Sequence, residues 1–236
     1  MNQSKALTEG SLEVLGLLPR SSNSTFLARA RSGDDEALVV YKPRRGEAPL
    51  WDFPEGTLCQ REVAAYAVSR ALGWPDVPPT VLRDGPAGEG SVQLFVEFDP
   101  EQHYFTMAEE PARRDEFRRI AAFDLIVNNA DRKAGHCLCA RDGGGVFVID
   151  HGVSFSIEPK LRTVIWEFAG EPIPDELRED ARRVAGSIGN GPLREELRPL
   201  LDDDEVAATA RRALAVSRAE RFPYPAGGRP YPWPPV

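Results

Sequence analysis

The segment Ala121–Phe155, AAFDLIVNNADRKAGHCLCARDGGGVFVIDHGVSF, constrains this chain more than any other part of the sequence. Asp131 lies in a polar loop after a helix-like run, and Asp150 ends an apolar, strand-like run. Between the two aspartates a Gly-rich turn separates Cys137–Ala140 from Val146–Ile149, which is the pattern of a β-hairpin. The segment therefore places two carboxylates at the chain positions where a phosphoryl-transfer site needs them.

The chain before this segment contains short apolar or alternating runs and one longer run with helical spacing. The short runs predict strands over Leu12–Leu18, Thr25–Arg31, Ala37–Lys42, Thr80–Arg83 and Ser91–Phe98. The helical spacing covers Leu58–Leu72 and stops at Gly73, a residue type that commonly ends helices. Asp99-Pro100 then breaks the last strand, and we expect a hinge there.

The chain after residue 100 is mainly helical in pattern, apart from the hairpin. Helices are predicted over Asp115–Asn128, Asp175–Ile188, Leu193–Leu200 and Asp204–Arg221. The sequence thus predicts an α+β fold in two lobes: residues 1–98 form a small β-rich N-lobe with one helix, and residues 99–236 form a mainly helical C-lobe.

The C-terminal tail, residues 222–236, is too rich in proline to be helical and is expected to be extended. Its aromatic side chains are Phe222, Tyr224, Tyr231 and Trp233. They are expected either to pin the tail to the domain or to bind a partner protein.

Four motifs give the chain a resemblance to a known superfamily. They are Val40-Tyr41-Lys42-Pro43, Arg61-Glu62-Val63-Ala64-Ala65-Tyr66, Asp131-Arg132 and Ile149-Asp150-His151-Gly152. With these motifs the chain resembles the atypical kinases, which include the phosphatidylinositol 3- and 4-kinases and the HipA-type bacterial Ser/Thr kinases. It is most similar to a functionally uncharacterised actinobacterial family of similar length. The resemblance runs from Leu12 to Phe155 and implies a two-lobed protein-kinase-like fold that uses ATP with Mg²⁺ or Mn²⁺.

The resemblance implies that Lys42 holds ATP phosphates and that Glu62, on the helix that follows, fixes this flexible lysine. Taken alone, the two residues also fit a solvated strand-end lysine and a surface glutamate.

The rest of the nucleotide site has a weaker signature. The turn between the first two strands contains Ser22 and Asn23 but lacks the glycines of a phosphate loop. It either cradles phosphate through hydroxyl groups and backbone amides or is a plain polar hairpin. By the same resemblance, the backbone of Val96, Glu97 and Phe98 would bind adenine.

The remaining expected roles fall on the segment between the two aspartates. Asp131 would orient the attacking hydroxyl, and Asp150 would bind the metal. Arg132 would either neutralise the transferring phosphate or brace the loop against another carboxylate, and Asp124 would be structural and need polar partners. His136 occupies the position, five residues after Asp131, where the resembling kinases carry an asparagine that binds the second metal. Imidazole suits Mn²⁺ better than Mg²⁺, so a nucleotide-binding pseudokinase remains the alternative to an active phosphotransferase.

Charge and composition limit the classes of molecule that the protein is expected to bind. The net charge is −8 and no basic block occurs, which argues against nucleic acid and against stable docking on anionic membranes. Lys160 and Arg162 are the cations of Gly152–Trp166, which disfavours a phosphoinositide acceptor and leaves a protein hydroxyl or a small polar molecule. The sequence has neither an apolar run of membrane-helix length nor the apolar core of a signal peptide, so a cytoplasmic location is expected.

Overall fold

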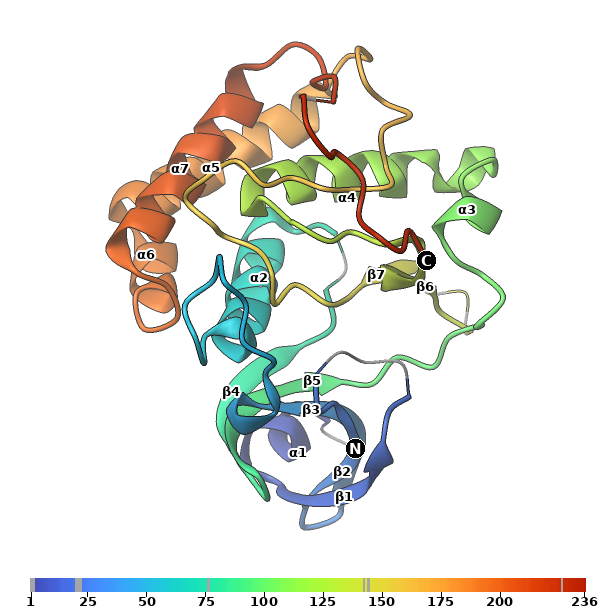
Figure 1. Ribbon diagram of the computed structural model, residues 1–236, viewed down its shortest axis with the longest axis vertical. Coiled ribbons are helices and arrows are strands. Elements are labelled where there is room, and N and C mark those ends of the chain that lie inside the picture. The colour runs from blue at the N-terminus through green and yellow to red at the C-terminus, as the bar shows by residue number, and fades with distance from the viewer. Residues whose placement is uncertain (1–2, 20–22, 76, 142, 144, 226) are drawn as a thin grey trace.

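The computed structural model describes residues 3–19, 23–75, 77–141, 143, 145–225 and 227–236. A five-stranded sheet forms one end of the molecule and a group of helices forms the other (Figure 1). The expected α+β class and the two-part architecture are therefore confirmed. In the described ranges, every helix is too short or too polar to cross a membrane.

The sheet is antiparallel throughout and has the strand order β1-β2-β3-β5-β4. Its strands are β1 (Ser11–Leu17), β2 (Phe26–Ser32), β3 (Asp35–Pro43), β4 (Thr80–Gly85) and β5 (Gly88–Leu94). Along β3, Ala37, Val39 and Tyr41 alternate into a small apolar core that helix α1 (Gln3–Glu9) covers. Because side chains alternate between the two faces of a strand, Lys42 lies on the face opposite Tyr41.

Helix α2 (Leu58–Leu72) has the bounds that the sequence predicts. Its first turn is capped by the Glu47 carboxylate, which accepts hydrogen bonds from the N–H groups of Leu58 (3.1 Å) and Cys59 (2.7 Å). Gly73 ends the helix with a φ of 84°, a left-handed conformation that glycine adopts without a Cβ clash. The apolar side of α2 packs into the core of the helical part, so this helix joins the two ends of the molecule.

The helical part contains the large core of the protein. Its elements are α3 (Tyr104–Met107), α4 (Arg114–Val127), the hairpin β6 (Cys137–Cys139) and β7 (Val146–Val148), α5 (Asp175–Asn190), α6 (Pro192–Leu197) and α7 (Asp203–Arg218). Three short 3₁₀ helices span Arg44–Gly46, Pro111–Arg113 and Ala134–His136. Helix α4 buries Phe117, Ile120 and Phe123, and it ends at Asn128, whose φ is 54°. This end of α4 delivers the chain to the loop that carries Asp131.

Three predicted elements end three or four residues earlier than expected. Helix α6 stops at Leu197 rather than Leu200. Strand β5 stops at Leu94 rather than Phe98, because the chain leaves the sheet and pairs with the hairpin of the helical part. In that pairing Asp99 N–H donates to Cys139 (3.1 Å) and Arg141 N–H donates to Glu97 (3.0 Å). Helix α7 ends at Arg218 rather than Arg221, because Glu220 accepts a hydrogen bond from Ile173 N–H in an extended pairing.

The C-terminal tail is extended, as expected, and returns to the hairpin and the loop that carries Asp131 (Figure 1). Its backbone makes the contacts: Pro230 accepts from Thr163 N–H (3.0 Å) and Pro235 accepts from Ala134 N–H (2.8 Å). Phe222 is buried, whereas Tyr224 and Trp233 are 72% and 75% exposed and Tyr231 is also exposed. The expectation that the aromatic side chains pin the tail is therefore confirmed for Phe222 and for Tyr224, whose ring lies against Gly170, whereas Tyr231 and Trp233 are exposed.

Candidate active site

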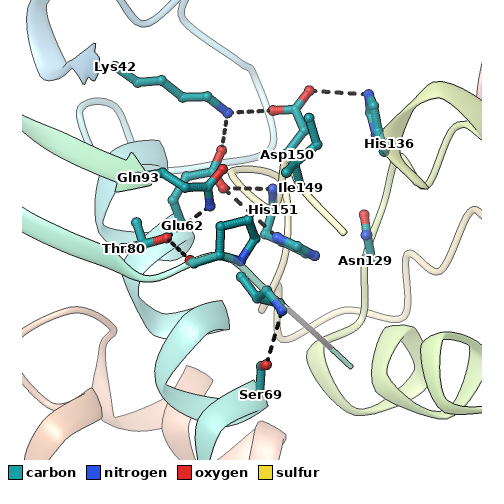
Figure 2. A network of polar contacts seen from close by, with 12 residues as sticks. Lys42, Glu62, Ser69, Thr80, Gln93, Asn129, His136, Ile149, Asp150 and His151 are labelled. Carbon is teal, nitrogen blue, oxygen red and sulfur yellow. Dashed lines mark hydrogen bonds and ion pairs between the residues drawn. The ribbon is translucent and has the colours of Figure 1, made fainter. Parts of the chain in front are cut away.

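A cluster of charged side chains lies where the sheet, helix α2 and the end of β7 meet (Figure 2). The Lys42 ammonium donates to the Glu62 carboxylate and, at 2.9 Å, to Oδ1 of Asp150. Burial opposes the charged form of Lys42, but Asp150 and Glu62 outweigh burial and raise the pKa of the ammonium. The Lys42 ammonium in turn lowers the pKa of Asp150 far below its usual range. We call Lys42, Glu62, Asp150 and the neighbouring His136 the lysine cluster.

The backbone at Asp150 is strained in a way that aims its carboxylate. Asp150 has a φ of 63°, in the left-handed region that residues other than glycine, asparagine and aspartate rarely adopt. The next N–H, that of His151, donates to Oε2 of Glu62 at 2.9 Å and helps to hold this conformation. The Asp150 side chain remains 50% exposed, whereas Glu62 is buried. The Asp150 carboxylate is thus open to a ligand, whereas the buried Glu62 carboxylate supports the conformation of Asp150.

His136 lies beside the open carboxylate. Its Nε2 is 3.3 Å from Oδ2 of Asp150, and its Nδ1 accepts a long hydrogen bond, 3.4 Å, from Lys133 N–H. Burial lowers the pKa of His136 to about 4, so the ring is neutral at neutral pH. A neutral ring that accepts at Nδ1 carries its proton on Nε2, the nitrogen that faces Asp150. The structure therefore brings the His136 imidazole and the Asp150 carboxylate together.

Asp131 lies in the loop that α4 delivers, and its N–H donates to Oδ1 of Asn129 at 3.0 Å. The pKa of the Asp131 carboxyl is raised by burial, which outweighs the opposing effect of Lys133. The Lys133 ammonium lies 3.1 Å from Oδ2 of Asp131. Sequence reasoning did not select Lys133; its place two residues after the loop aspartate is the signal that could have found it.

Arg132 faces inward, away from the solvent side of this loop. Its side chain is 0% exposed and donates to both oxygens of Asp124, at 3.0 and 2.9 Å. A third hydrogen bond, 3.0 Å long, goes from Nη1 to the carbonyl of Ile149. Of the two expected roles, the structure thus shows Arg132 bracing the loop against a carboxylate, and that carboxylate is Asp124. Asp124 finds its partners in the side chains of Arg132 and Asn129.

His151 completes this second group, which we call the arginine cluster: Asp124, Arg132 and His151. Nη2 of Arg132 lies 2.7 Å from Nε2 of His151, and the imidazole packs edge-on against Phe123. Because guanidinium can only donate, Nε2 of His151 accepts and its proton lies on Nδ1. Burial and the Arg132 charge lower the pKa of His151, which keeps the ring neutral. Sequence reasoning noted His151 as part of a motif, but its contact with Arg132 depends on tertiary structure.

The residues that the sequence analysis expects to bind the nucleotide are less fully described. Ser22 lies outside the described residues, and Asn23 accepts a hydrogen bond from Ala48 N–H at 2.8 Å. At the hinge, the carbonyl of Phe98 accepts from Nε of Arg141, and that of Glu97 accepts from the Arg141 N–H, each at 3.0 Å. These bonds fix the hinge backbone that sequence analysis assigned to adenine.

The residues fit a metal ion that arrives with a nucleotide. In the part of the chain that the structure describes, no three His, Cys, Asp or Glu side chains form a metal-binding group. Mg²⁺ in nucleotide sites is typically held by one or two carboxylates, with phosphate oxygens and water supplying the other ligands. The half-exposed Asp150, with His136 beside it, offers that kind of incomplete ligand set.

Comparison with known sequences places the chain among relatives. Protein Rv2133c of Mycobacterium tuberculosis is 42% identical over 97% of this chain and 93% of its own length. Phosphatidylinositol 4-kinase gamma 4 of rice is 31% identical over 61% of this chain, and its Arabidopsis thaliana counterpart is 26% identical over 69%. The matches cover 29% and 34% of those two plant proteins, respectively. No protein-family model matches the chain.

Comparison with solved structures gives weak similarities. The proinflammatory kinase CtkA of Helicobacter pylori has a TM-score of 0.47 and 14% identity, over 89% of this chain and 98% of CtkA. The toxin–antitoxin complex of HipA, HipB and operator DNA from Shewanella oneidensis contains a chain with a TM-score of 0.49 and 12% identity, over 87% of this chain and 65% of that chain. On its 42% identity over nearly the full length of both proteins, this chain belongs to the same family as Protein Rv2133c of Mycobacterium tuberculosis.

Proposed function

We propose that the protein is an ATP-dependent phosphotransferase that moves the γ-phosphate of ATP to a hydroxyl group. The observation that carries this proposal is the lysine cluster, in which Lys42 is fixed between Glu62 and Asp150. A lysine ammonium held at the end of a strand suits the binding of phosphate oxygens. Asp150, with His136 beside it, would hold Mg²⁺ or Mn²⁺, and the ion would supply charge neutralisation on the phosphates.

Asp131 would accept a hydrogen bond from the acceptor hydroxyl and orient it for attack. A carboxylate whose pKa is raised by burial is a better proton acceptor than a fully solvated one. Lys133, paired with Asp131 in the structure, would neutralise charge on the transferring phosphate. Arg132 supports both carboxylates indirectly, since it ties the loop of Asp131 to the Ile149 carbonyl that precedes Asp150.

The acceptor that fits best is a protein hydroxyl or a small polar molecule. An inositol phosphate head group needs several cations, and the segment after Asp150 supplies Lys160 and Arg162. The structure commits Lys160 elsewhere: its ammonium is 2.9 Å from Oδ2 of Asp52 and 4.8 Å from the centre of the Phe53 ring. This leaves Arg162 as the cation available to a phosphorylated acceptor from that segment, which weakens the case for a phosphoinositide.

A nucleotide-binding pseudokinase is the second candidate, and one observation favours it. His136 stands where the resembling kinases carry a metal-binding asparagine, and in the structure its Nε2 lies 3.3 Å from Oδ2 of Asp150. A site with one metal ligand in place of two could retain nucleotide without transferring phosphate. The two functions differ in turnover and not in binding.

The test is product analysis of the purified protein with ATP, Mg²⁺ or Mn²⁺ and candidate acceptors, by mass spectrometry. We expect ADP together with a phosphorylated acceptor or phosphorylated protein. Asp131→Asn should keep ATP affinity and lose about 100-fold or more of the transfer rate, because positioning the hydroxyl matters only for turnover. Asp115→Asn, at an exposed position at the start of α4, is the matched control and should retain activity.

Two outcomes would contradict the proposal. ATP binding without ADP or phosphorylated product, across both metals, would establish the pseudokinase. Transfer of AMP would show that the nucleotide is bound in the reverse orientation.

A further inference from the structure

A cavity of about 550 Å³ lies in the helical part, outside the lysine and arginine clusters. Helix α7 forms one wall, the end of α4 contributes Leu125 and Asn128, and the segment after the metal-binding aspartate contributes Ile157, Pro159 and Leu161. The α7 wall carries the small side chains of Ala208 and Ala215 together with Val216, and Ala219, which follows the helix, continues this wall. The lining is therefore mostly apolar, and the volume is in the range typical of small-molecule sites.

The polar part of the lining is cationic. Arg211, Arg212 and Arg221 all contribute to the cavity wall. Within the described ranges, no carboxylate lies within ion-pair distance of any of the three, although the protein carries a net charge of −8. Arg211 and Arg221 are exposed, Arg212 is partly buried, and all three lie beside the apolar wall.

Arg212 is the innermost of the three. Its guanidinium donates to neutral acceptors: the carbonyls of Ile126 (2.8 Å) and Ser156 (3.1 Å) and the hydroxyl of Thr209 (3.0 Å). These contacts use three of the five N–H donors of a guanidinium. Burial and the charge of Arg211 lower the pKa of Arg212 to about 10, against the opposing charge of the Glu205 carboxylate. A partly buried cation without an anionic partner is costly, and an anion delivered by a ligand would offset that cost.

We infer that this cavity binds a long-chain carboxylate, with its alkyl chain along the alanine wall of α7 and its head group among Arg211, Arg212 and Arg221. A guanidinium fork matches the two oxygens of a carboxylate, and a single flexible alkyl chain needs only a narrow apolar channel. The site is separate from the phosphotransferase function proposed above. Its wall includes Ile157 and Leu161, which flank Lys160 and its contact with Asp52.

The test is calorimetric titration of the whole protein with octanoate, decanoate and dodecanoate, kept below their micelle concentrations. We expect one saturable site and an affinity that rises about fourfold for each methylene added. Dodecanol, which has the same chain and no charge, should bind at least tenfold more weakly than dodecanoate. Equal binding of dodecanol, or the absence of saturable binding by dodecanoate, would overturn the inference.

Matched variants locate the site. Ala215→Trp places a large side chain in the cavity and should weaken dodecanoate binding at least tenfold, whereas Ala207→Trp, at an exposed position on α7 outside the lining, should not. Arg211→Gln combined with Arg221→Gln should weaken binding severalfold, whereas Arg182→Gln on α5 should leave it unchanged. Because the arginine variants alter exposed side chains, they test the site even if the tryptophan variant folds poorly.

Sedimentation velocity of the ligand-free protein tests whether a second copy of the chain, and not a fatty acid, covers the cavity. We expect the same species in the native protein and in Ala215→Trp. A dimer that Ala215→Trp dissociates would show that a second copy of the chain covers this wall, and that result would overturn the fatty-acid assignment. Binding that survives all the lining variants would place the ligand elsewhere on the protein and would also overturn it.

Discussion

The lysine cluster and the arginine cluster lie on either side of the same backbone turn, yet they differ in exposure. Lys42 and Asp150 retain solvent access, and their charges can regroup around a ligand. Asp124 and Arg132 are sealed from solvent, and every described contact of their side chains is internal. A buried ion pair fixes the conformation of the segments that carry it, whereas an exposed ion pair can exchange its partner for a ligand. In the function proposed above, the exposed lysine cluster would bind the substrate, whereas the buried arginine cluster positions the loop.

The largest expected effect comes from breaking the sealed pair. Asp124→Asn keeps the size of the side chain but leaves the Arg132 cation buried without its counter-ion. We expect a loss of about 3–5 kcal/mol in the free energy of unfolding, measured by urea denaturation. Asp175→Asn is the control, because Asp175 is 87% exposed in its pair with Arg178 and should cost about 1 kcal/mol or less. Similar losses for the two variants would show that the arginine cluster carries no special role.

A smaller loss of stability is expected for a variant of His151, the third member of the arginine cluster. His151→Phe should preserve the edge-on packing against Phe123 but remove the acceptor of an Arg132 N–H group. An unsatisfied buried donor costs about 1–3 kcal/mol, so this variant should be less destabilised than Asp124→Asn. The same denaturation experiment measures it. An unchanged stability would mean that Arg132 finds another acceptor and that His151 only fills space.

The smallest expected effect concerns the metal. His136→Asn replaces an imidazole by the amide that the resembling kinases carry, and an amide oxygen suits Mg²⁺ better than an imidazole nitrogen does. We expect the ratio of activity in Mg²⁺ to activity in Mn²⁺ to rise severalfold, measured as initial rates of ADP formation. An identical ratio in the variant and the native protein would show that His136 is not a metal ligand.

Much of the fold could be predicted because local signals agree with tertiary structure. Helix α2 begins and ends where its apolar spacing and Gly73 place it, and the alternation in β3 fixes which face Lys42 occupies. Helices α1 and α3 have seven and four residues, too few for a helical period to show in the sequence. The end of β5 depends on pairing with a hairpin more than forty residues later, and no local pattern records such a pairing.

The residues of the candidate site could likewise be predicted from the sequence only in part. Lys42, Glu62, Asp131 and Asp150 lie near the strand and helix ends that their motifs mark, and the structure joins Lys42 to Glu62 and Asp150. The inward turn of Arg132 could not be predicted with certainty, because it depends on the burial of Asp124 one helical turn before the loop. Exposure of an arginine is a property of the whole fold and not of its neighbours in sequence.

The most direct test of the central claim is the thermal stabilisation of the protein by ATP with Mg²⁺ or Mn²⁺. A ligand at 100 times its dissociation constant should stabilise the native protein by about 2.7 kcal/mol and raise its melting temperature. Lys42→Ala and Asp150→Ala should each lose most of this shift, while Arg182→Gln on the surface of α5 should retain it. Equal shifts in the native protein and in both cluster variants would contradict the assignment of the lysine cluster as the nucleotide site.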